Sequence, residues 1–386
     1  MFKIVKTDKY TIIFILGIKI TLKKKEKKSD IDSVVWWIPS KKLRNIIRNL
    51  HNNIDNINNH IYNIDNRIND INNHIYNMDN RMNDINNHIY NLTNIGNQIN
   101  FKSDNLYDIL SNSIDITKIN KNTGILKDIQ NISLLLLQHF DRIAKENNIK
   151  YWLQGGALLG AYRQNKFTNW DDDVDIGVMR TDLDKLFQIF KNDSVFSVDY
   201  FYHMIWEYPA RMAKLTIKGE LNFWIDIFSY DYINIEDDKE DELWNYFIDK
   251  RMKLGIELRE LKLNYDFTPI YNYTDREKTD NIFNKYISEF SALKNGNHII
   301  FGIDNIISSY KRLFKYNMIF PLKELMFEDK KYPVPNNYES YIYRQYGDPF
   351  KFPRYFHCHF DLSHNYDNLK LSIDNIYKKL KEAKLI

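Results

Sequence analysis

The sequence predicts an α+β protein in which a long N-terminal coiled coil precedes a domain built on a mixed sheet. From Leu43 to Leu92, apolar residues recur in steps of three and four without a break. From Thr123 onward, helix-like segments alternate with short apolar, strand-like segments, some of which contain aspartates. The predicted divisions are a basic N-terminal segment at 1–40, a coiled coil at 41–95, a linker at 96–120 and the mixed-sheet domain at 121–386.

Length and composition set the first limits. A chain of 386 residues can hold more than one unit, and 44% hydrophobic residues are enough for a real core. The single cysteine, Cys358, excludes an internal disulfide framework and any zinc module built on several cysteines. A single cysteine fits a reducing compartment, so a soluble intracellular protein is slightly favoured. The sequence does not decide the cellular compartment.

The N-terminal segment is basic, because residues 1–50 hold 13 Lys and Arg against 4 Asp and Glu. Such a leader can touch an anionic surface or be a solvated tail, and we expect no nucleic-acid partner. The apolar stretch Tyr10–Leu22 has only 13 residues and contains Lys19. A spanning helix needs about 20 residues, so a membrane anchor is possible but not favoured. A strand that turns at Gly17 is the alternative.

A 14-residue unit repeats within the coiled-coil segment. The unit at 57–70 is followed at 71–84 by a copy with only Ile-to-Met changes, and a partial third copy begins at Ile85. Fourteen residues are two heptads, so the sustained 3.5-residue period predicts a left-handed coiled coil. Isoleucine at both core positions favours assemblies above the dimer. We therefore expect a homo-oligomer, with a trimer favoured.

Three aspartates have the setting of metal ligands. Residues two apart in a strand face the same side, so Asp173 and Asp175 project together while Val174 points into the core. Asp226 is an isolated carboxylate inside a second apolar strand, 223–228. Burying several ionised carboxylates is costly unless a cation neutralises them. Hard cations such as Mg²⁺ or Mn²⁺ prefer these oxygen ligands.

A glycine pair precedes the acidic segment. Gly155 and Gly156 open a short apolar helix, where backbone amides can approach phosphate oxygens. The order of a glycine pair, then Asp-apolar-Asp, then apolar-Asp-apolar resembles the nucleotidyltransferase fold of the DNA polymerase β type.

A closer resemblance follows from two motifs. The stretch 156–163 (GALLGAYR) and the stretch 170–176 (WDDDVDI) look like the signature of the LicD/fukutin/fukutin-related family. The strand around Asp226 is similar to the family's second acidic strand, and 320–327, 334–335 and 346–348 resemble its C-terminal half. The sequence departs from the pattern at Ala157, where Thr or Ser is usual, and at Asn169, where Pro is usual.

The resemblance implies metal-dependent transfer of a phospho-alcohol, such as phosphocholine or ribitol phosphate, from a CDP-linked donor to a glycan hydroxyl. Asp173 and Asp175 would hold Mg²⁺ or Mn²⁺, and Asp226 would be a third ligand or the base for the acceptor hydroxyl. The substrate-binding positions implied by the same motifs are Gly155, Gly156, Arg163 and Trp170. Arginine binds phosphate bidentately, which suits Arg163 to a phosphate clamp.

Two other functions remain open. A glycosyltransferase of the GT-A type also uses an Asp-x-Asp metal motif, but takes a nucleotide sugar. A structural or attachment protein with a decayed catalytic domain is the non-enzymatic alternative, against which the three intact carboxylates argue. The roles of Asp171, Asp172 and the segment 357–359 (His-Cys-His) are undecided from the sequence.

Overall fold

The computed structural model describes residues 2–6, 10–15, 18–23, 40–204, 209–306, 310–353, 358–360, 362 and 366–386. The chain divides into two compact units, Met1–Asp104 and Asn105–Ile386.

The first unit contains a small antiparallel sheet and most of one long helix. The sheet has the order β1 (Phe2–Lys6), β2 (Tyr10–Ile15) and β3 (Ile18–Lys23). Residue 10 pairs with residue 23 and residue 15 with residue 18, so the apolar stretch forms two strands. The turn expected at Gly17 lies outside the described residues. Among the described helices, none combines the length and the apolar character that crossing a bilayer requires.

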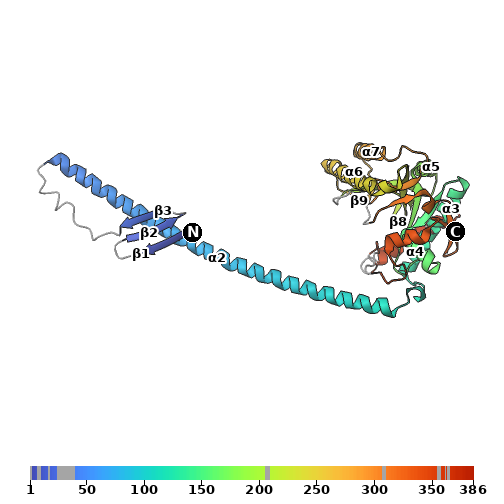
Figure 1. Ribbon diagram of the computed structural model, residues 1–386, viewed down its shortest axis with the longest axis horizontal. Coiled ribbons are helices and arrows are strands. Elements are labelled where there is room, and N and C mark those ends of the chain that lie inside the picture. Colours follow the sequence, from blue (N-terminus) through green and yellow to red (C-terminus); the bar gives the residue numbers. More distant parts are fainter. Residues whose placement is uncertain are drawn as a thin grey trace. The chain divides into compact units, whose positions relative to one another are not determined.

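Helix α2 runs from Lys41 to Ser113, over 73 residues, and none of them is buried (Figure 1). The heptad positions therefore lie on a helix, as expected, and most of their side chains are exposed: Ile57 is 58% and Ile71 is 56% accessible. The helix continues through much of the segment where we expected a linker. No proline interrupts it, and a single internal glycine, Gly96, costs only about 1 kcal/mol. The connector to the next helix is therefore short.

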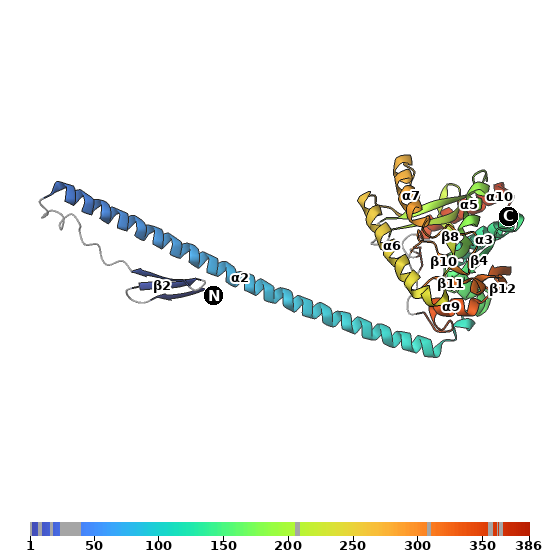
Figure 2. The same ribbon diagram turned by 45° about the horizontal axis from the view of Figure 1, so that its top comes forward.

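The second unit has a mixed α+β architecture around an eight-stranded sheet, as the sequence predicts (Figures 1 and 2). Its main path is β11-β10-β8-β7-β6-β9, and β5 joins β8 and carries β4. The strands are β4 (Tyr151–Gln154), β5 (Val174–Met179), β6 (Phe196–His203), β7 (Ala210–Ile217), β8 (Glu220–Ile233), β9 (Asp266–Thr268), β10 (His298–Phe301) and β11 (Leu313–Lys315). A separate hairpin joins β12 (Lys323–Phe327) to β13 (Lys330–Val334).

The helices of this unit are α3 (Ile125–Glu146), α4 (Gly155–Gln164), α5 (Arg180–Phe190), α6 (Glu240–Glu260), α7 (Tyr273–Ile287), α8 (Tyr316–Ile319), α9 (Tyr338–Tyr346) and α10 (Tyr366–Glu382). Short 3-10 turns lie at Ile116–Lys118 (η1) and Asp237–Lys239 (η2). Helix α3 begins close to the expected Thr123, and one face of it is apolar and buried, with Ile129, Leu136 and Phe140 fully or almost fully buried.

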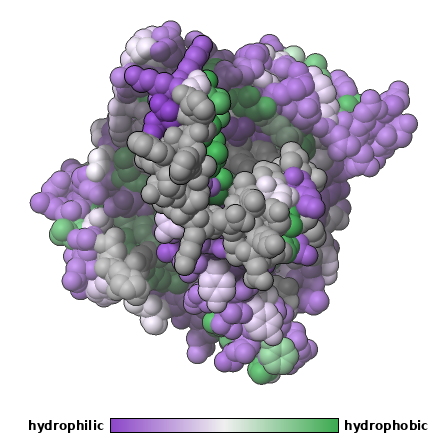
Figure 3. Space-filling model, turned by 90° about the vertical axis from the view of Figure 1, so that its left-hand side faces the viewer, coloured by the Kyte–Doolittle hydropathy of each residue, from purple (hydrophilic) through white to green (hydrophobic). Residues whose placement is uncertain are grey.

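Two hydrophobic cores support the sheet. The larger one contains residues of α3, β4, β5, β7 and β8, including Trp152, Ile176 and Ile225. The smaller one lies under α6 and α7, which pack together at one side of the sheet (Figure 2). The face of the molecule shown in Figure 3 is mostly hydrophilic, with small groups of hydrophobic side chains between the polar ones.

Candidate active site

Strand β8 is central to the candidate site because it pairs with β5 on one side and β7 on the other. The parallel pairing with β5 sets Asp175 beside Asp226, and the antiparallel pairing with β7 sets Lys214 beside Asp226. Side chains at paired positions share a face of the sheet. Three charged groups from three neighbouring strands therefore form one row.

Asp173 completes the acidic group from just before β5, which begins at Val174. One carboxylate oxygen from each of Asp173, Asp175 and Asp226 lies within 4.8 Å of the other two. The structure thus brings together the three carboxylates singled out from the sequence. Asp173 is 8% and Asp226 is 5% exposed.

Burial and mutual repulsion act on these carboxylates. Burial, with the neighbouring carboxylates, raises the pKa of Asp173 to about 6 and holds the pKa of Asp175 well above its ordinary value. The same causes hold the pKa of Asp171 well above its ordinary value. A cluster that disfavours its own ionised form in this way is suited to a divalent cation, which neutralises it. The residues present therefore fit Mg²⁺ or Mn²⁺.

The glycine pair packs directly against the carboxylates. A Cβ atom on Gly155 would lie 1.9 Å from Asp175 Oδ2, and one on Gly156 would lie 1.8 Å from Asp171 Oδ2. Gly155 also has a φ of 59°, in the left-handed region. These glycines make room for two half-buried carboxylates, those of Asp171 and Asp175, at the start of α4. This packing role could not be read from the sequence, and phosphate binding by their backbone stays a prediction.

The acidic row lies on the wall of a large cavity of about 1160 Å³. Of the residues predicted for the site, Gly156, Arg163, Trp170, Asp173, Asp175 and Asp226 line it. Gly155 lies behind the wall, against Asp175. A cavity of this volume can hold a nucleotide-sized ligand.

Arg163 contributes a positive charge to this cavity. Its guanidinium carbon lies 5.9 Å from the centre of the Trp170 ring, and its Nε donates a hydrogen bond to the carbonyl oxygen of Pro349. Burial lowers the pKa of Arg163 to about 10. Within the described part of the chain, its Nη1 is buried and has no hydrogen-bond partner. A buried donor of this kind favours an anionic ligand.

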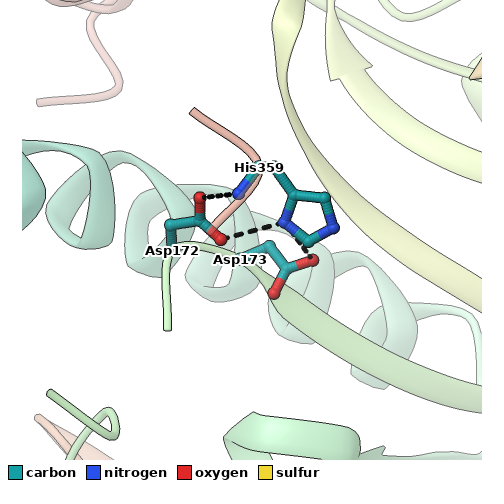
Figure 4. Close-up of side chains that lie close together, drawn as sticks. All are labelled: Asp172, Asp173 and His359. Carbon is teal, nitrogen blue, oxygen red and sulfur yellow. Dashed lines mark hydrogen bonds and ion pairs between the residues drawn. The ribbon is translucent and has the colours of Figure 1, made fainter. Parts of the chain in front are cut away.

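Asp172 anchors the segment at 358–359 (Figure 4). Asp172 Oδ2 accepts hydrogen bonds from the His359 backbone amide at 2.7 Å and from Cys358 Sγ at 3.0 Å. His359 Nδ1 lies 2.9 Å from Asp172 Oδ1 and 3.6 Å from Asp173 Oδ2. Asp172 therefore positions an imidazole beside the acidic row. His357 lies outside the described residues.

The pKa values of Asp172 and His359 are shifted in the directions that favour an ion pair between them. Burial alone would lower the pKa of His359, but the hydrogen bond with Asp172 and the nearby carboxylates raise it to about 9. Burial alone would raise the pKa of Asp172, but its bonds with His359 and Cys358 lower it. Burial and Asp172 raise the pKa of the Cys358 thiol to about 12, so the thiol stays protonated.

Lys214 is the site residue that the sequence analysis missed. Its Nζ lies 2.9 Å from Asp226 Oδ1, and its side chain is 4% exposed. The signal was of the same kind as that for Asp226: Lys214 is a charged residue directly between two apolar residues of a strand, Ala213 and Leu215. A single ammonium group offsets only part of the negative charge of the three carboxylates, so the net charge of the cluster still favours binding of a metal cation.

The second unit is thus a mixed-sheet domain with convergent carboxylates beside a nucleotide-sized cavity. Residues 148–261 match the family model described as the LicD/FKTN/FKRP nucleotidyltransferase domain. The matched residues include the glycine pair, Asp173, Asp175 and Asp226, so the candidate site lies within the part of the chain that matches the LicD/FKTN/FKRP domain.

Three curated relatives are similar to this chain over very different lengths. A lipopolysaccharide cholinephosphotransferase, LicD, of Haemophilus influenzae is 20% identical over 268 residues, which cover 59% of this chain and 92% of the relative. The human ribitol 5-phosphate transferase FKRP is 49% identical over 35 residues, which cover 9% of this chain and 7% of the relative. An uncharacterized protein of Rickettsia prowazekii, RP689, is 44% identical over 54 residues, only 20% of its length.

Proposed function

We propose that this protein transfers a phospho-alcohol, of the phosphocholine or ribitol-phosphate kind, from a CDP-linked donor to a hydroxyl group of a glycan. The observation that carries the proposal is the convergence of Asp173, Asp175 and Asp226 on one wall of the cavity. The names of two of the relatives support the same reaction type, since one is a cholinephosphotransferase and the other a ribitol 5-phosphate transferase.

Each of four residues on the cavity wall has its own role in the proposed reaction. Asp173 and Asp175 hold Mg²⁺ or Mn²⁺, which when bound neutralises the charge of the donor diphosphate. Asp226 is the third ligand or accepts the proton of the acceptor hydroxyl. Arg163 binds a donor phosphate through its buried Nη1.

The reaction is a displacement at phosphorus. The acceptor oxygen forms a bond to the phosphorus that carries the alcohol, the bond from that phosphorus to the bridging oxygen breaks, and CMP leaves with the bridging oxygen. Most of the catalysis in such a transfer comes from positioning and from charge stabilisation. Trp170, next to Arg163, forms part of the wall that orients the donor.

The test is nucleotide release from a panel of donors. The full chain is incubated with Mg²⁺ or Mn²⁺, glycan acceptors, several CDP-alcohols, and UDP- and GDP-sugars. Release of CMP that is lost in Asp173→Asn and Asp175→Asn supports the proposal. Release of UDP or GDP instead favours the GT-A type of glycosyltransferase. Failure to bind any divalent metal in the presence of nucleotide, measured by calorimetry, favours the decayed, structural alternative.

We also propose that helix α2 joins copies of this chain, with a trimer favoured. Apolar side chains at the heptad positions are about half exposed over the length of the helix, for example Ile57, Ile64 and Ile75. Exposed apolar surface arranged with a 3.5-residue period is buried when helices supercoil around each other. Isoleucine at both core positions supports an assembly above the dimer.

Analytical ultracentrifugation tests this assembly. A peptide of residues 41–95 is expected to form a helical oligomer larger than a dimer, and a monomeric peptide would contradict the proposal. In the full chain, Ile64→Asn together with Ile68→Asn should lower the oligomeric state, because both side chains occupy core positions. Asn66→Ala is the matched control, since it lies on the outer face of the same two turns.

A further inference from the structure

A lysine side chain on the cavity wall, Lys214, has its ammonium group among three aromatic rings. Lys214 Nζ lies 3.9 Å from the centre of the Trp224 ring, 5.4 Å from that of Phe267 and 5.6 Å from that of Phe201. We call these four residues the lysine box. All four line the cavity, and they come from β6, β7, β8 and β9. Aromatic faces around one point are the arrangement in which proteins bind ammonium and quaternary ammonium groups.

The lysine box lies on one side of the acidic row, and the start of α4 lies on the other. Lys214 on β7 pairs with Asp226 on β8, which pairs with Asp175 on β5. Asp175 in turn packs against Gly155 at the start of α4. The acidic row therefore separates the lysine box from the α4 side of the cavity.

The α4 side has the features that suit the nucleotide part of a donor. Arg163 is on α4 and lies near the Trp170 ring, so this side offers a buried guanidinium to phosphate and an aromatic face to a base. The diphosphate lies over the acidic row in the proposed reaction. The alcohol carried by the second phosphate then extends toward the lysine box.

We propose that the donor alcohol is an uncharged polyol, and that Lys214 makes the site reject choline. This inference rests on the function proposed above and narrows its donor. The box is already occupied by an ammonium group, whose side chain is 4% exposed and cannot withdraw into solvent without losing Asp226 and Trp224. A second cation at this wall would be repelled at short range. Hydroxyl groups of a polyol instead accept hydrogen bonds from the Lys214 ammonium.

The charges near the box do not reverse this preference. Asp226 is in contact with Lys214 and belongs to the row that holds the metal in the proposed function. Asp266 also lines the cavity, but its side chain is 69% exposed, so water and salt screen its charge. Lys214 is the buried charge that lies inside the aromatic group.

Two donors of equal shape isolate the effect of charge. CDP-choline is compared with CDP-3,3-dimethylbutanol, in which carbon replaces the quaternary nitrogen, and CDP-glycerol and CDP-ribitol are included as polyols. Affinity for the full chain is measured by calorimetry with Mn²⁺, and kcat/KM is measured by CMP release. The affinity for the neutral analogue is expected to be at least about tenfold higher than that for CDP-choline. The polyol donors are expected to give the highest kcat/KM.

Variants of Lys214 assign the effect to this side chain. Lys214→Met should bring the ratio between the two analogues to one or reverse it toward choline, because the aromatic rings are then open to a cation. Lys214→Arg should keep the ratio of the wild type. Lys351→Met is the matched control, because Lys351 also lines the cavity but is not part of the box. Its substitution should change affinity for both analogues equally.

The outcomes separate this inference from the function on which it rests. CDP-choline that binds as well as its neutral analogue in the wild type would overturn the inference and leave phospho-alcohol transfer standing. The wild-type comparison needs no variant, so poor folding of Lys214→Met would not obscure it. If no CDP-alcohol binds or releases CMP, both the proposed function and the inference fall.

Discussion

Two buried clusters of charged residues in the second unit differ in how the negative charge of their aspartates is balanced. In the acidic row, Asp173, Asp175 and Asp226 converge, Lys214 forms an ion pair with Asp226, and His359 lies beside Asp173. In the second cluster, arginines match the carboxylates. Arg180 bonds Asp231 at 2.8 Å and Asp304 at 2.8 Å, and Arg211 reaches Asp304 at 3.2 Å.

The difference appears in the pKa values of one aspartate from each cluster, Asp304 and Asp173. Burial would raise the pKa of Asp304, but Arg180 and Arg211 lower it to about 2, so its charge is stable. Burial and like charges raise the pKa of Asp173 to about 6. Where arginines balance the charge of the aspartates, the cluster stabilises the fold. Where the carboxylates outnumber the nearby cations, the cluster can bind a metal cation.

Asp175→Asn should lower kcat for CMP release by about 10³-fold, because it removes a ligand charge while keeping the shape of the side chain. It should not lower the midpoint of thermal unfolding in metal-free buffer, because one buried like charge is removed. Activity within tenfold of the wild type would mean that Asp175 does not hold the metal. Thermal unfolding followed by circular dichroism supplies the stability control.

Arg180→Met should lower the free energy of unfolding by about 3–5 kcal/mol, since Asp231 and Asp304 would lose a buried partner. Urea denaturation measures this loss. The matched control is Arg142→Met, which removes an exposed pair with Glu146 and should cost less than about 1 kcal/mol. Equal effects of the two substitutions would show that burial does not distinguish these ion pairs.

Mn²⁺ should stabilise the protein more at pH 8 than at pH 5. Folding raises the pKa of Asp173 from 3.8 to about 6, so the proton on Asp173 stabilises the fold fully below pH 3.8. That contribution is lost as the pH rises through about 6, where the metal can replace the proton. With Mn²⁺ at 100 times its Kd, the gain at pH 8 is about 3 kcal/mol, measured by thermal unfolding. An equal gain at both pH values would contradict proton–metal competition.

Asp172→Asn should lower kcat about tenfold, the smallest effect of the four, because it weakens a charge-assisted hydrogen bond worth about 1.5–3 kcal/mol. It should also lower the pKa of His359 from about 9, which NMR titration of the imidazole would detect. Cys358→Ala is the control, since it removes a contact to Asp172 without removing the charge. An unchanged pKa of His359 would mean that Asp172 does not hold this imidazole.

Much of the architecture was evident from residue patterns. The periodicity between Leu43 and Leu92 predicted a helix, and α2 contains that whole segment. The apolar strands around Asp175 and Asp226 were expected to carry ligands of one metal site, and these strands are paired in parallel. These features depend on local spacing, which the sequence displays directly. The stoichiometry of the helix stays a prediction because it depends on contacts between chains.

The remaining features depend on which strands become neighbours. That Asp173, Asp175 and Asp226 share a suitable chemistry was determined by the sequence alone, because carboxylates in apolar surroundings demand a counter-charge. That Lys214 reaches Asp226, that Asp172 holds His359 and that Gly155 makes room for Asp175 was decided only by the tertiary structure. Asp172 and His359 are 187 residues apart in the chain. Contacts between distant residues follow from the register of the sheet and the path of the connecting loops, which local spacing does not specify.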